Sequence, residues 1–310
     1  MGRRRSGRAI NGVLVVDKPG GISSNDAVQQ VKKIYAAQKV GHTGSLDPLA
    51  TGVLPLCLGE ATKFSRFLLE SDKAYTAQIR LGVRTDTGDA DGEVVDERDA
   101  ASITLSQIET ELARFRGAID QVPSMYSAIK HNGQPLYKLA RQGIEVAREP
   151  RRVQIYKNEV LSLHEQLLEL EIECSKGTYV RTIAEDLGEV LGCGAHVTAL
   201  RRTGAGPYRL DEAVTIAELA SLRSAEDEHT ALDAKLMPVE STVAQWPEVR
   251  LGESSAFYLS QGQAVQVAHA PSRGWVRLLA DEAGDVQRFL GVGEVNSDGL
   301  IAPRRLVNTQ

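Results

Sequence analysis

Cysteine is scarce in this sequence, with three in 310 residues, and Cys57, Cys174 and Cys193 stand far apart. No pair has the Cys-x-x-Cys spacing, and none of the six histidines belongs to a His-x-x-x-His pattern. Zinc sites and disulfide frameworks need such clusters or even numbers of cysteines. The sequence therefore predicts neither a bound metal nor a disulfide, and it fits a reducing compartment.

Long apolar runs are missing as well. Residues 1–8 carry the positive charges of a secretory signal, but the apolar run at 13–16 that follows is short and ends at Asp17. No stretch approaches the ~20 apolar residues that cross a bilayer. We expect a soluble cytoplasmic protein that does not bind a membrane.

An excess of positive charge is also absent, because 36 basic and 41 acidic residues give a net charge of −5. This net charge excludes a protein that is basic over its whole surface and coats nucleic acid. A local basic patch remains compatible with the net charge. Positive charge gathers in residues 1–9, which we expect to form a flexible arm, and in residues 123–157. The second segment has seven basic and two acidic residues, with Tyr126, His131 and Tyr137 between them. Basic groups neutralise phosphates and aromatic rings stack on bases, so the mixture favours RNA, and a solvated loop is the alternative.

The densest motif is residues 41–52, where three glycines and one proline demand an unusual backbone. Its chemically active groups are the imidazole of His42 and the carboxylate of Asp47. A phosphate-binding P-loop ends in Gly-Lys-Ser/Thr, which is missing here, so no nucleotide cofactor is predicted. A tight structural turn capped by Asp47 is the competing interpretation.

Residues 85–93 form an acidic, glycine-containing segment that imitates a calcium loop. In the EF-hand register the two end ligands would be Thr87 and Arg98, so the pattern fails. We interpret Asp86, Asp89 and Asp91 as turn-forming residues. A metal-dependent hydrolase built on these three acids is the weakest of the functional hypotheses.

Residues 174–182 lead from a strand through Gly177 into a helix whose first turn offers Tyr179 and Arg181. An arginine in this place can hold a carboxylate with two hydrogen bonds and keep it ionised. The alternative is an ordinary surface arginine on a helix.

Periodicity predicts strands at 12–16, 53–58, 74–81, 153–163, 167–174 and 196–202. It predicts helices behind the N-cap Ser23 and at 61–69, 104–115, 178–191 and 216–222. Short β-like runs in 249–310 predict a small β-rich unit.

Several long motifs occur in a characteristic order, and in them the chain strongly resembles the TruB family of tRNA pseudouridine synthases. The resemblance runs from about residue 10 to the C-terminus. Its motifs are DKPGGISS (17–24), GHTGSLDPLATG (41–52), KAY (73–75), GVRTDTGD (82–89), CSKGTYVR (174–181), GCGAH (192–196), LRR (200–202), GVGE (291–294) and IAPRRL (301–306).

The resemblance implies an isomerase that converts the uridine at position 55, in the TΨC loop of tRNA, into pseudouridine. Such a reaction breaks an N–C glycosidic bond, turns the base and makes a C–C bond, so it requires no cofactor, nucleotide or metal. It needs a carboxylate that acts as nucleophile or base, and a base flipped out of its stack. A non-catalytic tRNA-binding or RNA-folding protein is the alternative function.

The family's functional residues match individual positions of this chain. By that likeness Asp47 is the catalytic carboxylate and Arg181 pairs with it, Tyr179 bonds the substrate, and Leu200 lines the base pocket. His42 and Tyr75 contact or stack near the base, with His42 as the candidate for filling the vacated space. The RNA-contacting residues we expect are Lys130, Arg141, Arg151, Arg152, Arg201 and Arg202.

The expected fold class is α/β, a mixed α+β pseudouridine synthase fold around a central, mostly antiparallel mixed sheet. We expect a catalytic domain at 10–248, with a basic RNA-gripping insertion at 123–152. A small β-rich PUA-like RNA-binding domain should follow at 249–310. The expected partner is a tRNA, bound by a monomer.

Overall fold

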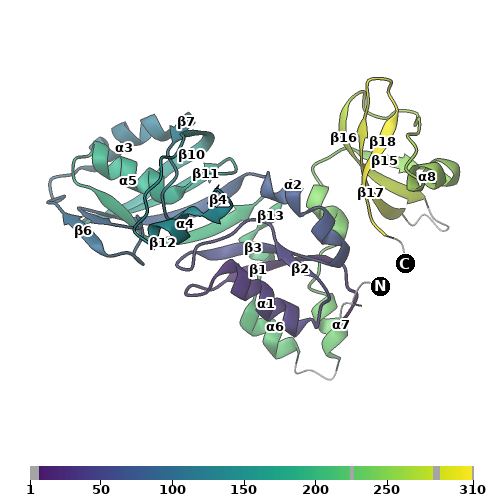
Figure 1. The fold of residues 1–310 in the computed structure, drawn as a ribbon, viewed down its shortest axis with the longest axis horizontal. Coiled ribbons are helices and arrows are strands. Elements are labelled where there is room, and N and C mark those ends of the chain that lie inside the picture. The colour runs from purple at the N-terminus through teal and green to yellow at the C-terminus, as the bar shows by residue number, and fades with distance from the viewer. Residues whose placement is uncertain (1–6, 224–226, 282–286, 309–310) are drawn as a thin grey trace.

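A computed structural model of the protein describes residues 7–223, 227–281 and 287–308. Its centre is a ten-stranded sheet with the order β14-β1-β3-β12-β4-β11-β10-β7, to which β13 and β2 add at β12 and β3 (Figure 1). The strands are β1 (Gly12–Lys18), β2 (Val40–His42), β3 (Thr51–Leu58), β4 (Lys73–Leu81), β7 (Gly117–Gln121), β10 (Arg151–His164), β11 (Leu167–Cys174), β12 (Ala195–Ala205), β13 (Tyr208–Arg209) and β14 (Val214–Thr215).

Only β14/β1 and β3/β12 pair in parallel among these strands, and every other pair is antiparallel. The prediction of a mostly antiparallel mixed sheet is therefore confirmed. Strand β11 shows why the pattern was readable, because Leu168, Leu170 and Ile172 are buried while glutamates alternate with them.

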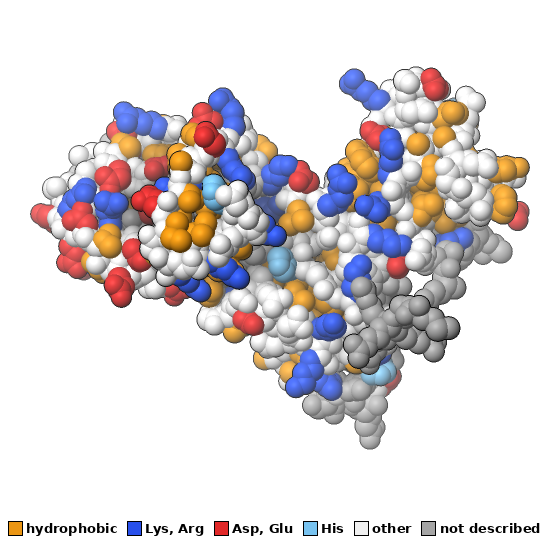
Figure 2. Space-filling view, in the orientation of Figure 1, with side chains coloured by type: hydrophobic (Ala, Val, Ile, Leu, Met, Phe, Trp, Pro, Cys, Tyr) orange, Lys and Arg blue, Asp and Glu red, His pale blue; other side chains and the backbone are white. Residues whose placement is uncertain are grey.

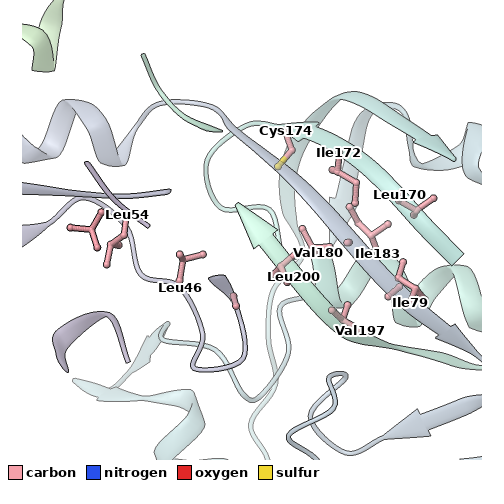
Figure 3. Packing of buried hydrophobic residues seen from close by; sticks show 14 of the residues in the cluster. Leu46, Leu54, Ile79, Leu170, Ile172, Cys174, Val180, Ile183, Val197 and Leu200 are labelled. Atoms are coloured by element: carbon pink, nitrogen blue, oxygen red, sulfur yellow. The ribbon is translucent and has the colours of Figure 1, made fainter. Parts of the chain in front are cut away.

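Helices α3 (Leu105–Leu112) and α5 (Val180–Val190) pack on the half of the sheet formed by β4, β10 and β12. Figure 3 shows buried side chains of this core, among them Ile79, Leu170 and Ile183. At the other half, α1 (Ser24–Ile34) packs against β2 and α6 (Ile216–Leu222). Helix α1 begins where predicted, because Ser23 and Asp26 form a reciprocal capping box.

Two of the predicted helices are interrupted. The segment expected at 61–69 is the 3-10 helix η1 (Gly59–Lys63) followed by α2 (Ser65–Leu69), with the fully buried Phe64 between them. The segment expected at 104–115 is α3 followed by η2 (Ala113–Phe115). Further elements are α7 (Glu228–Asp233), η3 (Leu210–Glu212) and η4 (Val239–Val243).

A second sheet, of four strands, follows at the C-terminal end, as the β-like runs predicted. It has the order β15-β16-β17-β18, its own buried core, and the helix α8. The bounds are β15 (Glu248–Leu251), α8 (Glu253–Ser260), β16 (Gly274–Asp281), β17 (Gln287–Val295) and β18 (Ile301–Leu306). An aromatic cluster joins the two units: Trp246 stacks on Trp275 with 5.1 Å between ring centroids, and Phe67 contacts both.

Two small substructures extend from the large sheet to the site described below. The first is the hairpin of β5 (Val83–Thr85) and β6 (Val94–Glu97). The second lies within the basic insertion and consists of β8 (Lys130–His131), β9 (Gln134–Pro135) and α4 (Leu136–Ala140).

Of the basic arm predicted at 1–9, residues 1–6 lie outside the described residues. From residue 7 the chain is bound to the body. The Arg8 amide donates to Ala36 O at 2.6 Å, and its guanidinium lies 2.6 Å from Asp233 Oδ2. Within the described ranges, no helix has the length and apolar character needed to cross a membrane.

Candidate active site

The loop between β2 and β3 carries Asp47 and is held by a buried arginine. Arg202, on β12, is 2% exposed and donates from Nε to Val53 O at 2.7 Å. Its terminal nitrogens donate to Gly44 O at 3.2 Å and Ser45 O at 3.4 Å. Gly52 permits β3 to pair closely with β12 at this point, because a Cβ there would lie 2.2 Å from the carbonyl oxygen of Arg202.

Further hydrogen bonds fix the residues on either side of Asp47. The Leu46 amide donates to Ser24 Oγ at 2.7 Å, and Ser24 Oγ donates to Leu46 O at 3.1 Å. The buried Lys18 ammonium donates to Pro48 O at 3.4 Å, and burial lowers the pKa of Lys18 to about 8. The backbone around Asp47 is thus preorganised from both ends, and the Asp47 side chain, 46% exposed, is left available.

Arg181, in the first turn of α5, connects two carboxylates. Its Nη2 lies 3.1 Å from Asp47 Oδ2, and its Nη1 lies 3.0 Å from Asp89 Oδ2. The Arg181 and Asp89 side chains are each 7% exposed. The other Asp89 oxygen accepts from Thr87 Oγ1 at 2.6 Å and from the Asp91 amide at 3.2 Å.

The acidic loop is therefore turn-forming, as interpreted, and it also supplies a site residue that the sequence reading missed. The spacing of Asp89 gave no indication of its partner, which lies 92 residues away in the chain. Within the described part of the chain, no three His, Cys, Asp or Glu side chains come together as a metal site.

The basic insertion also reaches Arg181. The carbonyl oxygen of Tyr126 accepts from Arg181 Nη2 at 3.1 Å, and the Tyr126 hydroxyl donates to Asp86 Oδ2 at 2.8 Å. A basic segment and an acidic loop thus meet at one guanidinium.

Burial and the charge of Arg181 act on the pKa of Asp47 in opposite directions. Burial raises the pKa of Asp47 and outweighs the positive charge of Arg181, while the nearby Asp89 and Asp91 raise it further. A carboxyl with a raised pKa is a stronger base than a free aspartate once it is ionised.

A pocket of about 110 Å³ opens beside Asp47. Of the six residues that the resemblance implied for the site, five line this pocket: Asp47, Tyr75, Tyr179, Arg181 and Leu200. The remaining lining residues are Ser45, Leu46, Ser127, Ala128, Thr178 and Val180. In Figure 3, Leu46, Val180 and Leu200 appear in this region.

Burial raises the pKa of both Tyr75 and Tyr179, so these phenols remain neutral hydrogen-bonding groups at neutral pH. His42 ends β2 and is not one of the lining residues. Its Nδ1 accepts from the Gly44 amide at 3.4 Å, and burial lowers the pKa of His42. The imidazole is therefore neutral and belongs to the same loop as Asp47.

The six residues expected to contact RNA fall into different environments. Lys130, Arg141, Arg151 and Arg152 are exposed, and Arg201 is half-buried with its Nη2 2.7 Å from Asp17 Oδ2. Arg202 differs from the other five, because its side chain is buried and donates to backbone carbonyls. Figure 2 shows lysine and arginine side chains around the hollow between the two lobes of the molecule.

Taken together, the fold presents one available carboxylate, bound to a buried arginine, in a pocket walled by two phenol rings and a leucine. Chemically, a carboxylate beside flat and apolar walls can act as a nucleophile or base towards a planar ring.

Three family models cover most of the chain. Residues 32–180 match the "TruB family pseudouridylate synthase (N terminal domain)". Residues 181–244 match the "tRNA pseudouridylate synthase B C-terminal domain", and residues 247–307 match "Pseudouridine synthase II TruB, C-terminal".

Curated relatives agree over nearly the whole length. The chain is 54% identical over 312 residues to "tRNA pseudouridine synthase B" of Aliivibrio fischeri, covering 99% of this chain and 98% of the relative. It is 53% identical over 300 residues to the protein of that name from Coxiella burnetii, covering 97% and 96%. A chain of the solved "Cbf5-Nop10-Gar1 Complex" superposes with a TM-score of 0.71 at 25% identity, covering 96% of this chain and 84% of that one.

The chain belongs to the TruB family of pseudouridine synthases. Its enzymatic class is accordingly an isomerase that converts uridine into pseudouridine.

Proposed function

We propose that this enzyme isomerises the uridine at position 55 in the TΨC loop of tRNA, with Asp47 as the catalytic carboxylate. The observation that carries the proposal is the pairing of Asp47 with the buried Arg181 at 3.1 Å, inside a pocket whose other walls are Tyr75, Tyr179 and Leu200. The near full-length relatives named for tRNA support the substrate class.

The chemistry balances without a co-reactant. The N–C bond between ribose and uracil breaks, the base turns within the pocket, and a C–C bond forms from the ring carbon. The proton on that carbon leaves, and the former glycosidic nitrogen gains one. Asp47 serves as nucleophile or base, because its carboxylate is the available one in the pocket. Tyr179 hydrogen-bonds the base, while Tyr75 and Leu200 provide flat and apolar walls for its rotation.

The base must leave its stack before it can enter a pocket of this kind, which costs a few kcal/mol. We assign to His42 the filling of the vacated space in the RNA. Its neutral imidazole, on the same loop as Asp47, suits stacking against bases.

The test of the proposed function is the Asp47→Asn variant on a tRNA transcript, because asparagine preserves size and removes the charge. We expect binding to persist and pseudouridine formation to be lost. Undiminished pseudouridine formation in Asp47→Asn contradicts the assignment. Tight tRNA binding without isomerisation by the unaltered enzyme favours the alternative, a non-catalytic tRNA-binding or RNA-folding protein.

RNA contacts are assigned to the exposed part of the basic insertion at 123–152. Changing Arg141, Arg151 and Arg152 to Glu should weaken tRNA binding and flatten its salt dependence, since each lost phosphate contact removes roughly one unit of slope. An unchanged slope places the RNA track elsewhere. Residues 249–310 are assigned as a PUA-like RNA-binding domain, joined to a catalytic domain at 10–248.

We assign the enzyme to the cytoplasm as a monomer. One chain supplies every residue of the pocket, and the three cysteines are free thiols buried in the fold, which suits a reducing compartment. Light scattering coupled to gel filtration measures the mass in solution, and a stable dimer contradicts the assignment.

A further inference from the structure

A second pocket, of about 160 Å³, lies in the basic insertion where β8 and α4 meet the start of β10. Three of its lining residues carry a positive charge, Lys130, Arg148 and Arg151, and one, Glu149, carries a negative charge. The remaining lining residues are Pro123, Ile129, His131, Leu136 and Ala147. The pocket is thus positively charged on a partly apolar floor.

The cations of this pocket are poorly neutralised by the protein itself. Lys130 and Arg151 are exposed, and neither side chain has an ion pair or hydrogen bond with any residue that the structure describes. Arg148 forms one long ion pair, with its Nη2 3.7 Å from Glu145 Oε1. Its Nε is buried and has no acceptor in the described structure. A buried donor without an acceptor is unfavourable, and a bound anion would satisfy it.

The second pocket and the pocket at Asp47 are lined by consecutive residues of one segment. Ser127 and Ala128 line the first pocket, and the next three residues, 129–131, line the second. Two backbone bonds close this segment: the Tyr137 amide donates to Ser127 O at 3.1 Å, and the Leu136 amide donates to Ile129 O at 2.7 Å. One short, hydrogen-bonded stretch of chain therefore forms a wall of both pockets.

The charges support the same proximity. Tyr179 belongs to the first pocket, and burial raises its pKa, while the positive charge of Arg151 in the second pocket acts in the opposite direction. A ligand that occupies both pockets needs a flat ring and, close to it along the same chain, a negative group.

The geometry points to a phosphate-binding site: Lys130, Arg148 and Arg151 bind a backbone phosphate flanking the nucleotide whose base enters the pocket at Asp47. This inference rests on the proposed function. Arginine forks and a lysine ammonium match the several oxygens of a phosphodiester. Phosphate contacts position a nucleic acid and carry no sequence information. Fixing the flanking phosphate holds the backbone while the base is flipped.

The first experiment measures how stem-loop binding depends on salt for Arg151→Gln and Lys130→Gln. The control is Arg114→Gln, which removes an equal charge from an exposed arginine paired with Glu111. Each pocket variant should reduce the slope of log K against log salt by about one unit, and the control should leave it unchanged. Slopes equal to that of the unaltered enzyme in both pocket variants overturn the site.

The second experiment replaces one charged linkage of a TΨC stem-loop, on either side of the target uridine, by a neutral methylphosphonate. One such RNA should bind the unaltered enzyme about tenfold more weakly, the scale of one charge-assisted contact. The Arg151→Gln variant has already lost this contact. It should therefore bind the methylphosphonate RNA and the unmodified RNA with equal affinity. Equal losses in enzyme and variant show that the phosphate is bound elsewhere.

Titration with inorganic phosphate at constant ionic strength separates an RNA phosphate from a free anion. If the RNA occupies the pocket, bound stem-loop excludes inorganic phosphate. Phosphate binding that persists in the presence of saturating stem-loop contradicts the inference. Pseudouridine formation by the unaltered enzyme is measured in parallel, so a failure of the proposed function is distinguished from a failure of the phosphate site.

Discussion

Asp89 and Arg181 form a buried ion pair, with 3.0 Å between Oδ2 and Nη1 and both side chains 7% exposed. The second terminal nitrogen of Arg181 is thereby turned towards Asp47, which is 46% exposed in the pocket. Asp89 neutralises and orients the arginine, and Arg181 in turn pairs with the carboxylate of Asp47, which lines the pocket. Asp89 therefore acts as a positioning residue for Arg181, whereas Asp47 is the carboxylate proposed to carry the chemistry.

Replacing Asp89 by Ala should reduce both stability and turnover. Removing one partner of a buried ion pair typically costs 3–5 kcal/mol, so we expect a loss of about 3 kcal/mol in the free energy of unfolding. Denaturant unfolding and single-turnover pseudouridine formation check this. Asp91→Asn alters an exposed acid of the same loop and should leave stability unchanged. An Asp89→Ala enzyme with unchanged turnover contradicts the positioning role.

The raised pKa of Asp47 predicts an acidic limb in the pH–rate profile. In the proposed function the carboxylate form of Asp47 is the active one, so the single-turnover rate should fall as pH falls, with a midpoint above the ordinary aspartate value of 3.8. In Asp89→Asn the midpoint should move to lower pH, because the negative charge of Asp89 raises the pKa of Asp47. A midpoint below 3.8 in the unaltered enzyme is the opposite result.

The same pKa predicts that Asp47→Asn stabilises the fold at neutral pH. A carboxyl whose pKa is higher in the folded state than in the unfolded state binds its proton more tightly when folded. Its contribution to stability is therefore lost as pH rises through the interval between the two values. Asparagine carries no such dependence, so the variant should unfold at a higher temperature than the enzyme at pH 7. A lower unfolding temperature shows that the ion pair with Arg181 outweighs the burial cost.

Glu185 offers a pH effect that is separate from the active carboxylate. It follows Arg181 by one helical turn, and its carboxyl group packs against Gly88, where an added Cβ would lie 2.8 Å from it. Burial raises the pKa of Glu185 from 4.5 to about 7, with Arg181 and Arg84 opposing the shift and Asp186 and Asp89 adding to it.

Stability contributed by the protonated form of Glu185 is present below pH 4.5 and lost by about pH 7. Glu185→Gln should therefore be more stable than the enzyme at pH 8, by at most about 3 kcal/mol, and not more stable at pH 4.5. Chemical denaturation at the two pH values measures the difference. If the stability of Glu185→Gln changes with pH in the same way as that of the unaltered enzyme, Glu185 is not the source of the pH dependence.

Sequence patterns predicted the elements that depend on local alternation, such as the strands at 74–81 and 167–174, and the capped helix behind Ser23. The break at Phe64 was not predicted, because tertiary burial of that ring decides it. The family resemblance predicted the pairing of Asp47 with Arg181, which the structure shows. Asp89 was missed, because its pairing joins residues far apart in the chain and its motif also satisfies a local turn.

Arg202 shows the limit of reading charge from sequence. The Arg201-Arg202 pair looks like a phosphate-binding unit, yet alternation along β12 sends the Arg202 side chain into the protein. Local sequence reports that a residue is charged, whereas exposure of its side chain depends on which strand face the fold covers.

Arg202→Met should therefore lower turnover without altering the electrostatics of RNA binding. The change leaves the carbonyls of Gly44, Ser45 and Val53 without their donor and loosens the loop that carries Asp47. A displacement of about 1 Å in catalytic geometry costs on the order of 10²-fold in rate, which is the loss we expect under single-turnover conditions. The salt dependence of tRNA affinity should be unchanged, because the buried guanidinium contacts no phosphate. Arg202→Lys keeps the charge and should retain part of the rate. It serves as the second variant if Arg202→Met fails to fold. A slope reduced by about one unit in Arg202→Met shows instead that this arginine reaches the RNA.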